Sequence, residues 1–218
     1  MRDVVTEPLD SVLFGMIWKP WRREKKGPSL DEQIQELEER AATAPPGFRG
    51  QHLNRAGDLC AAAGDTGRAV RLWGQAIDSY LLAARPEAAA AMCRKVIRKK
   101  PDVVRARRTL ALLAVGRGHL QDAIGYVQGY VDAARAEGDR ALAVKQLGVM
   151  AEATREPEFR RHVVKLLREL GDDAAADRIE RAALEGQEMD GERREDADRW
   201  STMLQVALMS PEQVRRTL

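Results

Sequence analysis

The feature that most constrains the fold is a glycine-to-alanine step that recurs along the chain at nearly constant intervals. The two residues are five positions apart in each copy, and the copies start 54 and 53 residues apart: Gly64 with Ala69, Gly118 with Ala123, and Gly171 with Ala176. Repetition at a period of this size indicates a stack of similar structural units. Glycine can adopt the left-handed conformation that ends a helix, so each glycine predicts a turn between two helices.

The stretch from Leu53 to Tyr80 indicates what lies on either side of the first turn. Apolar or small residues recur every three or four positions, first as Leu53, Ala56, Gly57 and Cys60, then as Ala69, Val70, Trp73, Ala76, Ile77 and Tyr80. This spacing gives each helix one apolar face. We expect the two faces to pack together, with small residues allowing close approach and Trp73 buried between the helices.

The rest of the chain can be divided on the same pattern. Helices are predicted at 48–62, 66–84, 86–99, 102–116, 119–136, 139–153, 157–170 and 172–184, three to each full period. Ahead of them, Ser29 and Glu32 form a capping box that starts a helix over 29–44, which we expect to lie outside the array as a lid. The predicted class is all-α, and the 5% content of aromatic residues fits helices packed through small side chains.

Segments of different composition flank the predicted array at 48–184. Residues 1–28 are apolar and basic, 185–199 form a charged linker, and 200–218 contain short amphipathic helices. Trp200, Met203, Leu204, Ala207 and Leu208 give the first of these helices an apolar face. Two interpretations remain open for it, a helix that covers the end of the array or a helix that binds a partner.

The first helical pair resembles the tetratricopeptide repeat, whose pattern is W-x2-L-G-x2-Y, then A-x3-F-x2-A, then P. The residues that occupy these places are Leu53, Ala56, Gly57 and Cys60, then Ala69, Trp73 and Ala76, with Leu81 at the proline place. The resemblance implies a right-handed superhelix of antiparallel helix hairpins that binds a partner protein segment. The family's carboxylate clamp would use Asn54 and Asp58, and an aspartate there argues against that mode.

A basic corner lies between two predicted helices at 94–108. Its cations are Arg94, Lys95, Arg98, Lys99, Lys100, Arg105, Arg107 and Arg108, with only Asp102 against them. Three interpretations remain open: a solvated face, a site for an acidic segment of a partner or of the chain's own linker, and a site for nucleic acid or anionic lipid. The formal charge of +2 and the lack of interleaved aromatic residues disfavour nucleic acid.

The N-terminal segment from Leu9 to Trp21 is rich in large apolar residues, and Arg22, Arg23, Lys25 and Lys26 follow it. It is too short to cross a bilayer. Its candidate contact residues are Phe14, Ile17, Trp18 and Trp21. This composition is compatible with an intramolecular cap, a partner-docking peptide or a peripheral membrane contact.

The sequence carries no recognisable reactive constellation. His52, His119 and His162 lack metal-ligand spacing, and phosphate-loop, dinucleotide and nucleophile-elbow motifs are missing. We expect no catalytic residue, no cofactor and no metal. Cys60 and Cys93 lie on apolar stripes without a second cysteine nearby, so we expect reduced core residues, as is typical of a cytoplasmic protein.

These observations favour a protein–protein interaction adaptor or scaffold that is not an enzyme. Two alternatives stay open. One is a membrane-proximal subunit of a larger assembly tethered by residues 9–26, and the other is a nucleic-acid-associated regulator that uses the basic corner. We expect a cytoplasmic protein, either unattached or associated with a membrane.

Overall fold

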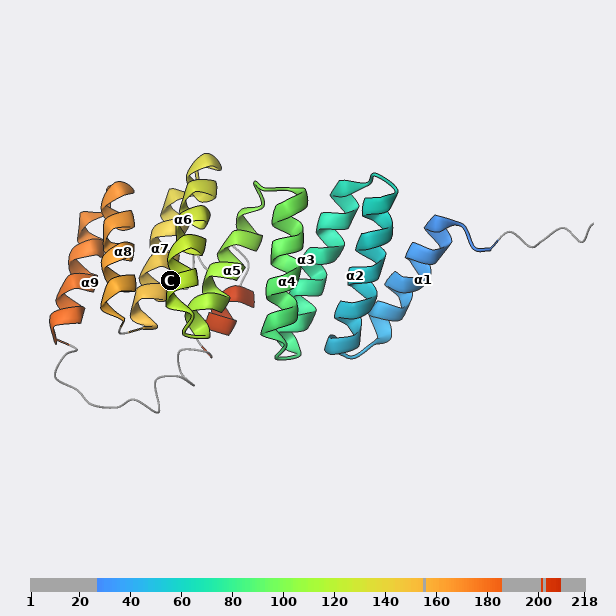
Figure 1. Cartoon of the computed structure of the whole chain (residues 1–218), viewed down its shortest axis with the longest axis horizontal. Coiled ribbons are helices and arrows are strands. Elements are labelled where there is room, and N and C mark those ends of the chain that lie inside the picture. Colours follow the sequence, from blue (N-terminus) through green and yellow to red (C-terminus); the bar gives the residue numbers. More distant parts are fainter. Residues whose placement is uncertain (1–26, 155, 186–200, 202, 209–218) are drawn as a thin grey trace, which may run out of the picture.

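The structure is a computed structural model that describes residues 27–154, 156–185, 201 and 203–208 (Figure 1). The described residues form nine helices of thirteen residues or more, in the order α1 (Leu30–Thr43), α2 (Pro46–Ala62), α3 (Thr66–Leu82), α4 (Pro86–Lys99), α5 (Val104–Gly116), α6 (Leu120–Ala136), α7 (Arg140–Glu152), α8 (Pro157–Glu169) and α9 (Asp173–Glu185). Each helix packs against the next one in the sequence. The all-α prediction is confirmed, and so is the predicted order of helices.

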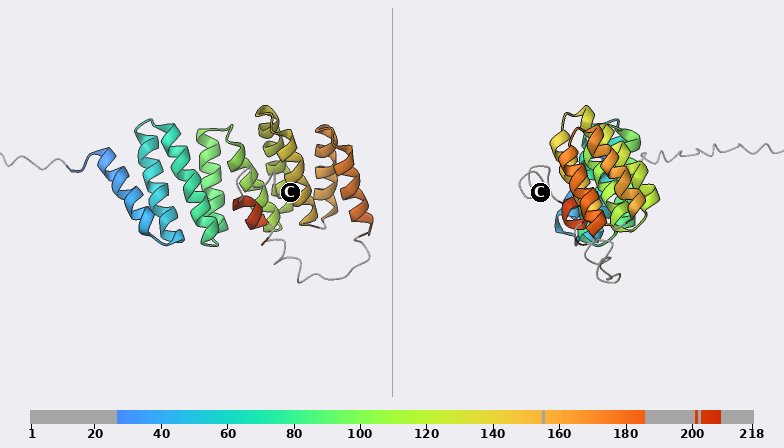
Figure 2. Two further views of the ribbon diagram at one scale, coloured as in Figure 1. Left: turned by 180° about the vertical axis from the view of Figure 1, so that it is seen from behind. Right: turned by 90° about the vertical axis from the view of Figure 1, so that its left-hand side faces the viewer.

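The helices form a row in which α1 and α9 lie at opposite ends (Figures 1 and 2). Contacts between helices that are not sequence neighbours join α6 to α8 and α7 to α9. Even-numbered and odd-numbered helices therefore alternate between two layers. We call the outer side of α1, α3, α5, α7 and α9 the odd face.

Five of the turns between helices share one hydrogen-bond pattern. In the first, the amide of Asp65 donates to the carbonyl of Cys60 at 2.9 Å, and the amide of Gly64 donates to Ala61 at 3.2 Å. The residue at the centre of each turn has a positive φ: Gly64, Ala84, Gly118, Gly138 and Gly171. This pattern is the Schellman motif, which satisfies carbonyl groups at a helix end. The glycines predicted to end helices are confirmed in that role.

Ala84 is the one alanine among these five turn residues, with a φ of 53°. A left-handed conformation strains any residue with a Cβ atom. We expect Ala84→Gly to stabilise the protein by about 1 kcal/mol, because glycine relieves this strain. The matched control is Ala83→Gly, where φ is −87° and the same change should destabilise by about 0.5 to 1 kcal/mol. Urea unfolding followed by circular dichroism measures both, and equal effects would contradict the assignment.

The first helical pair is packed as the sequence predicts. Trp73 is 1% exposed, and its Nε1 donates to the carbonyl of Asn54 at 3.3 Å and to Oδ1 of Asp58 at 3.1 Å. A Cβ atom added to Gly57 would lie 2.6 Å from Cδ1 of the Trp73 ring. Only glycine allows α2 to approach the indole this closely. The predicted burial of Trp73 is confirmed, and α3 packs against both α2 and α4.

The C-terminal helical stretch at 203–208 lies beside α5 on the odd face (Figures 1 and 2). Its residues Met203, Val206 and Ala207 are at most 3% exposed and belong to the same apolar core as the array. α5 itself, which also packs against α4 and α6, is buried on almost every side. The structure thus places this helix beside the middle of the array. One interpretation of the sequence places it at the end of the array instead.

Candidate functional site

The basic corner does not form one continuous cationic surface. Lys95 turns inward, where its Nζ lies 2.5 Å from Oδ1 of Asp58 and 2.7 Å from Oδ1 of Asn54. The same ammonium group lies 5.2 Å from the centroid of the Trp73 ring, within the range of a cation–π contact. Lys95 therefore joins α4 to the α2–α3 pair. Asn54 and Asp58, the positions of the family's carboxylate clamp, bind Lys95 of the same chain.

Arg108 does not lie on the surface of the basic corner. Its side chain is 1% exposed, because α5 is covered on almost every side. Burial lowers the pKa of the Arg108 guanidinium, and the interaction with Tyr130 acts in the opposite direction. Arg108 is a candidate partner-binding residue in the sequence analysis, but its burial removes it from the exposed surface of the basic corner. The burial of Arg108 could not be read from the sequence, because it depends on how other parts of the chain pack against α5.

Other cations of the basic corner also have partners within the protein. Arg105 pairs with Asp78 of α3, Nε of Arg107 donates to the carbonyl of Pro101 at 2.8 Å, and Lys100 lies 3.9 Å from Asp102. The side chains of Arg94, Arg98, Lys99, Lys100 and Arg105 are exposed, whereas Lys95 and Arg107 are half-buried. The exposed part of the corner is therefore smaller than the run of charges suggests.

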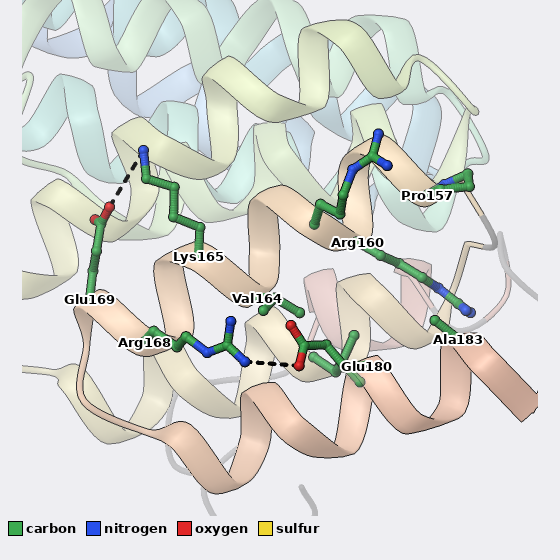
Figure 3. Close-up of a pocket in the computed structure, with 10 residues that line it drawn as sticks. Pro157, Arg160, Val164, Lys165, Arg168, Glu169, Glu180 and Ala183 are labelled. Carbon is green, nitrogen blue, oxygen red and sulfur yellow. Dashed lines mark hydrogen bonds and ion pairs between the residues drawn. The ribbon is translucent and has the colours of Figure 1, made fainter.

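A groove lies between α8 and α9, at the end of the row (Figure 3). We call it the terminal groove, and its volume is about 640 Å³. Its apolar lining is supplied by Pro157, Val164, Ile179 and Ala183, and its charged lining by Arg160, Arg161, Lys165, Arg168, Glu169 and Glu180. Four cations and two carboxylates surround an apolar floor, so the local charge is positive.

The cations of the terminal groove differ in how firmly they are held. Nε of Arg160 donates to the carbonyls of Ala151 and Thr154, at 3.1 and 2.6 Å. Lys165 lies 3.8 Å from Glu169, and Arg168 lies 2.8 Å from Glu180 (Figure 3). Exposed pairs of this kind contribute about 0–1 kcal/mol, so a carboxylate from another molecule can replace them at little cost. Among the described residues, Arg161 has no ion-pair partner.

His162 follows Arg161 on α8, and burial is the main reason that its pKa is lowered, with nearby Lys165 adding to the effect. The unfolded chain therefore binds the proton more readily than the folded protein does. Stability should fall as the pH drops below the ordinary value of 6.5 towards the lower pKa of the folded state. We expect this fall to be smaller in His162→Gln, measured as the urea midpoint between pH 7 and pH 5. Identical pH profiles for the variant and the native protein would contradict it.

A second groove lies between α1 and α3 on the odd face, with α2 as its floor. We call it the N-terminal groove, and its volume is about 570 Å³. Its apolar lining comes from Ala41 of α1, Leu53 of α2 and Leu72 of α3. Leu82 lines the groove as well, with 60% of its surface exposed. Glu38 and Asp78 line it as well, paired with Arg68 and Arg105 respectively.

The described residues offer little for metal or thiol chemistry. Cys60 and Cys93 are unpaired and buried, and burial raises the pKa of the Cys93 thiol to about 12. Such a thiol is protonated and unreactive at neutral pH. No group of three or more metal-ligating side chains occurs within the described residues, and none of their helices is long and apolar enough to cross a membrane.

The remaining predicted contact residues, Phe14, Ile17, Trp18 and Trp21, lie outside the part of the chain that the structure describes. The terminal groove was not predicted. Its cations recur along α8 at positions 160, 161, 165 and 168, which is a signal visible in the sequence. The apolar floor was not visible, because it needs Ile179 and Ala183 of the following helix.

Comparison of the chain with protein-family models and with curated protein sequences gives no match.

Proposed function

We propose that the chain is an adaptor of the tetratricopeptide type, in which the helices coil into a right-handed superhelix and the terminal groove holds an acidic amphipathic segment of a partner protein. The observation that carries this proposal is the apolar floor of the terminal groove surrounded by Arg160, Arg161, Lys165 and Arg168. An amphipathic helix laid in such a groove buries apolar side chains and places its polar side chains at the rim. The positive rim selects a partner segment with carboxylates at those positions.

The chain itself supplies a precedent for helix binding on this scaffold. The stretch at 203–208 places Met203, Val206 and Ala207 into the apolar core beside α5. These residues follow the array in the sequence and pack onto it from outside. A partner helix in the terminal groove would use the same kind of contact, with apolar side chains inserted between neighbouring helices.

The basic corner supports partner binding less well than the terminal groove does. Lys95 and Arg107 are half-buried and have partners within the protein, and Arg108 is buried. Neither the terminal groove nor the N-terminal groove is lined by Arg94, Arg98 or Lys99. A nucleic-acid-associated role through this corner therefore has weaker support.

A photo-cross-linking experiment tests the proposal. A benzophenone amino acid replaces Ala183 in the terminal groove, and the control places it at Ala91, an exposed position on α4. Illumination in native cells followed by mass spectrometry should yield an adduct at position 183 whose partner peptide is acidic and amphipathic. The control position should not yield it.

Three outcomes would overturn the proposed function. They are equal adducts at both positions, an adduct with a neutral or basic segment, and an adduct with the chain's own linker at 185–199.

A further inference from the structure

We propose that the chain's own apolar segment at 9–21 lies in the N-terminal groove, as a helix over residues 9–19 ahead of Pro20. This groove is at the other end of the row from the terminal groove, so the inference is independent of the proposed function. The first observation is the exposure of large apolar side chains. Among the described residues, those with marked exposure are Leu30, Phe48 and Leu82, and all three belong to the first three helices. This end of the array lacks an apolar cover among the described residues.

The segment has the composition of a buried helix. Its apolar residues fall at spacings of three and four on two stripes, namely Leu9, Val12, Leu13, Met16 and Ile17, and Phe14, Trp18 and Trp21. A helix that is apolar on most of its circumference must be covered on more than one side. The N-terminal groove offers such cover, because α1 and α3 form its walls and α2 forms its floor.

The lengths of the segment and of the groove agree. Residues 9–19 as a helix are about 16 Å long, and the groove follows α3 from Arg71 to Leu82, also about 16 Å along the helix axis. The connection is long enough as well. Residues 22–29 can span about 26–29 Å when extended, whereas Ala41 lies about 16 Å along α1 from Leu30. The segment can therefore enter the groove from the same chain.

The charged lining of the groove is balanced, with Arg49 and Arg71 against Glu38 and Asp78, so the net negative charge beside the groove comes from α1. α1 carries the five carboxylates Asp31, Glu32, Glu36, Glu38 and Glu39 against the single cation Arg40. The residues that connect the segment to α1 are the basic cluster Arg22, Arg23, Lys25 and Lys26. Opposite charges on neighbouring segments favour docking within one chain and set its orientation. With this occupant, Leu82 becomes buried and the first helices gain an N-terminal cap.

Disulfide trapping in the full chain tests the inference. Leu82→Cys on the rim of the groove is combined in turn with Phe14→Cys, Ile17→Cys or Trp21→Cys, so that three positions along the segment are sampled. Leu82 is 60% exposed, so its substitution leaves the core intact. Ala91→Cys on the exposed side of α4 replaces Leu82→Cys in the matched controls. The native Cys60 and Cys93 are 1% and 0% exposed and do not compete.

At low protein concentration, at least one pair with Leu82→Cys should form an intramolecular disulfide about tenfold faster than its Ala91→Cys control. Equal rates for all three pairs would overturn the inference. Disulfide-linked dimers in place of the intramolecular product would assign the groove to a second copy of the chain. Equal rates together with co-sedimentation on phosphatidylserine vesicles would assign the segment to a lipid surface. The dimer result and the vesicle result also reject the inference. All of these outcomes are independent of whether the terminal groove binds a partner.

Discussion

Replacing Trp73 by alanine is expected to lower the free energy of unfolding by about 3 to 5 kcal/mol, the range observed for removing a large aromatic side chain from a core. The indole is 1% exposed and fills the space between α2 and α3. Its loss also leaves Lys95 without the ring beneath it and removes two hydrogen bonds to α2. Gly57, which lies directly against the indole, has no side chain that could fill the space.

Urea unfolding followed by far-ultraviolet circular dichroism measures the effect of Trp73→Ala. Gln51→Ala on the neighbouring helix α2 is the control, since Gln51 is exposed, lies outside the N-terminal groove, and its truncation should change stability by no more than about 0.5 kcal/mol. A cost below about 1 kcal/mol for Trp73→Ala would show that the α2–α3 pair is not packed around the indole.

The second large effect is expected at Met203. This residue lies 160 residues after Thr43, the last residue of α1, yet it belongs to the same apolar core as the buried residues of α1. Met203→Ala should cost about 2 to 5 kcal/mol, because the side chain is 1% exposed and covers α5. Gln205→Ala is the control, as Gln205 is an exposed neighbour on the same helical stretch and should have an effect near zero.

The same unfolding experiment measures the Met203 pair, and proteolysis adds a second observable. Loss of the C-terminal contact should increase cleavage within 185–199 in Met203→Ala but not in Gln205→Ala. Equal stability of the two variants would contradict the placement of this helix beside α5.

Local signals in the sequence predicted the helices well. Gly64, Gly118 and Gly171 mark turns because a positive φ favours glycine, and Pro86 and Pro157 mark helix starts. The helix predicted at 66–84 ends at Leu82 instead, since Ala84 takes the left-handed conformation that its residue type does not signal. Turn positions that lack glycine are therefore where the sequence pattern misplaces a boundary.

Contacts between distant parts of the chain were not predictable in the same way. The charge run at 94–108 reads as one surface, yet Lys95 turns toward Asp58 and Arg108 is buried. Which side of a helix faces a neighbour depends on how α2, α4 and α5 are stacked. The terminal groove likewise combines Val164 of α8 with Ile179 of α9, and neither residue alone indicates a binding site.

Binding of an acidic segment in the terminal groove is tested most directly by measuring affinity for variants with paired charge reversals. The peptide identified by cross-linking is titrated against the native protein, against Arg161→Glu combined with Lys165→Glu, and against Arg98→Glu combined with Lys99→Glu. All four side chains are exposed, so neither pair of substitutions disturbs the core.

We expect the groove pair to raise the Kd about tenfold or more, because each reversal removes an attraction and adds a repulsion worth a fraction of a kcal/mol or more. The native affinity should weaken as salt is added. The pair at 98 and 99 carries the same change of net charge and should leave the Kd within about twofold. Equal losses from the two pairs, or a loss confined to the pair at 98 and 99, would contradict the claim and return the binding surface to the basic corner.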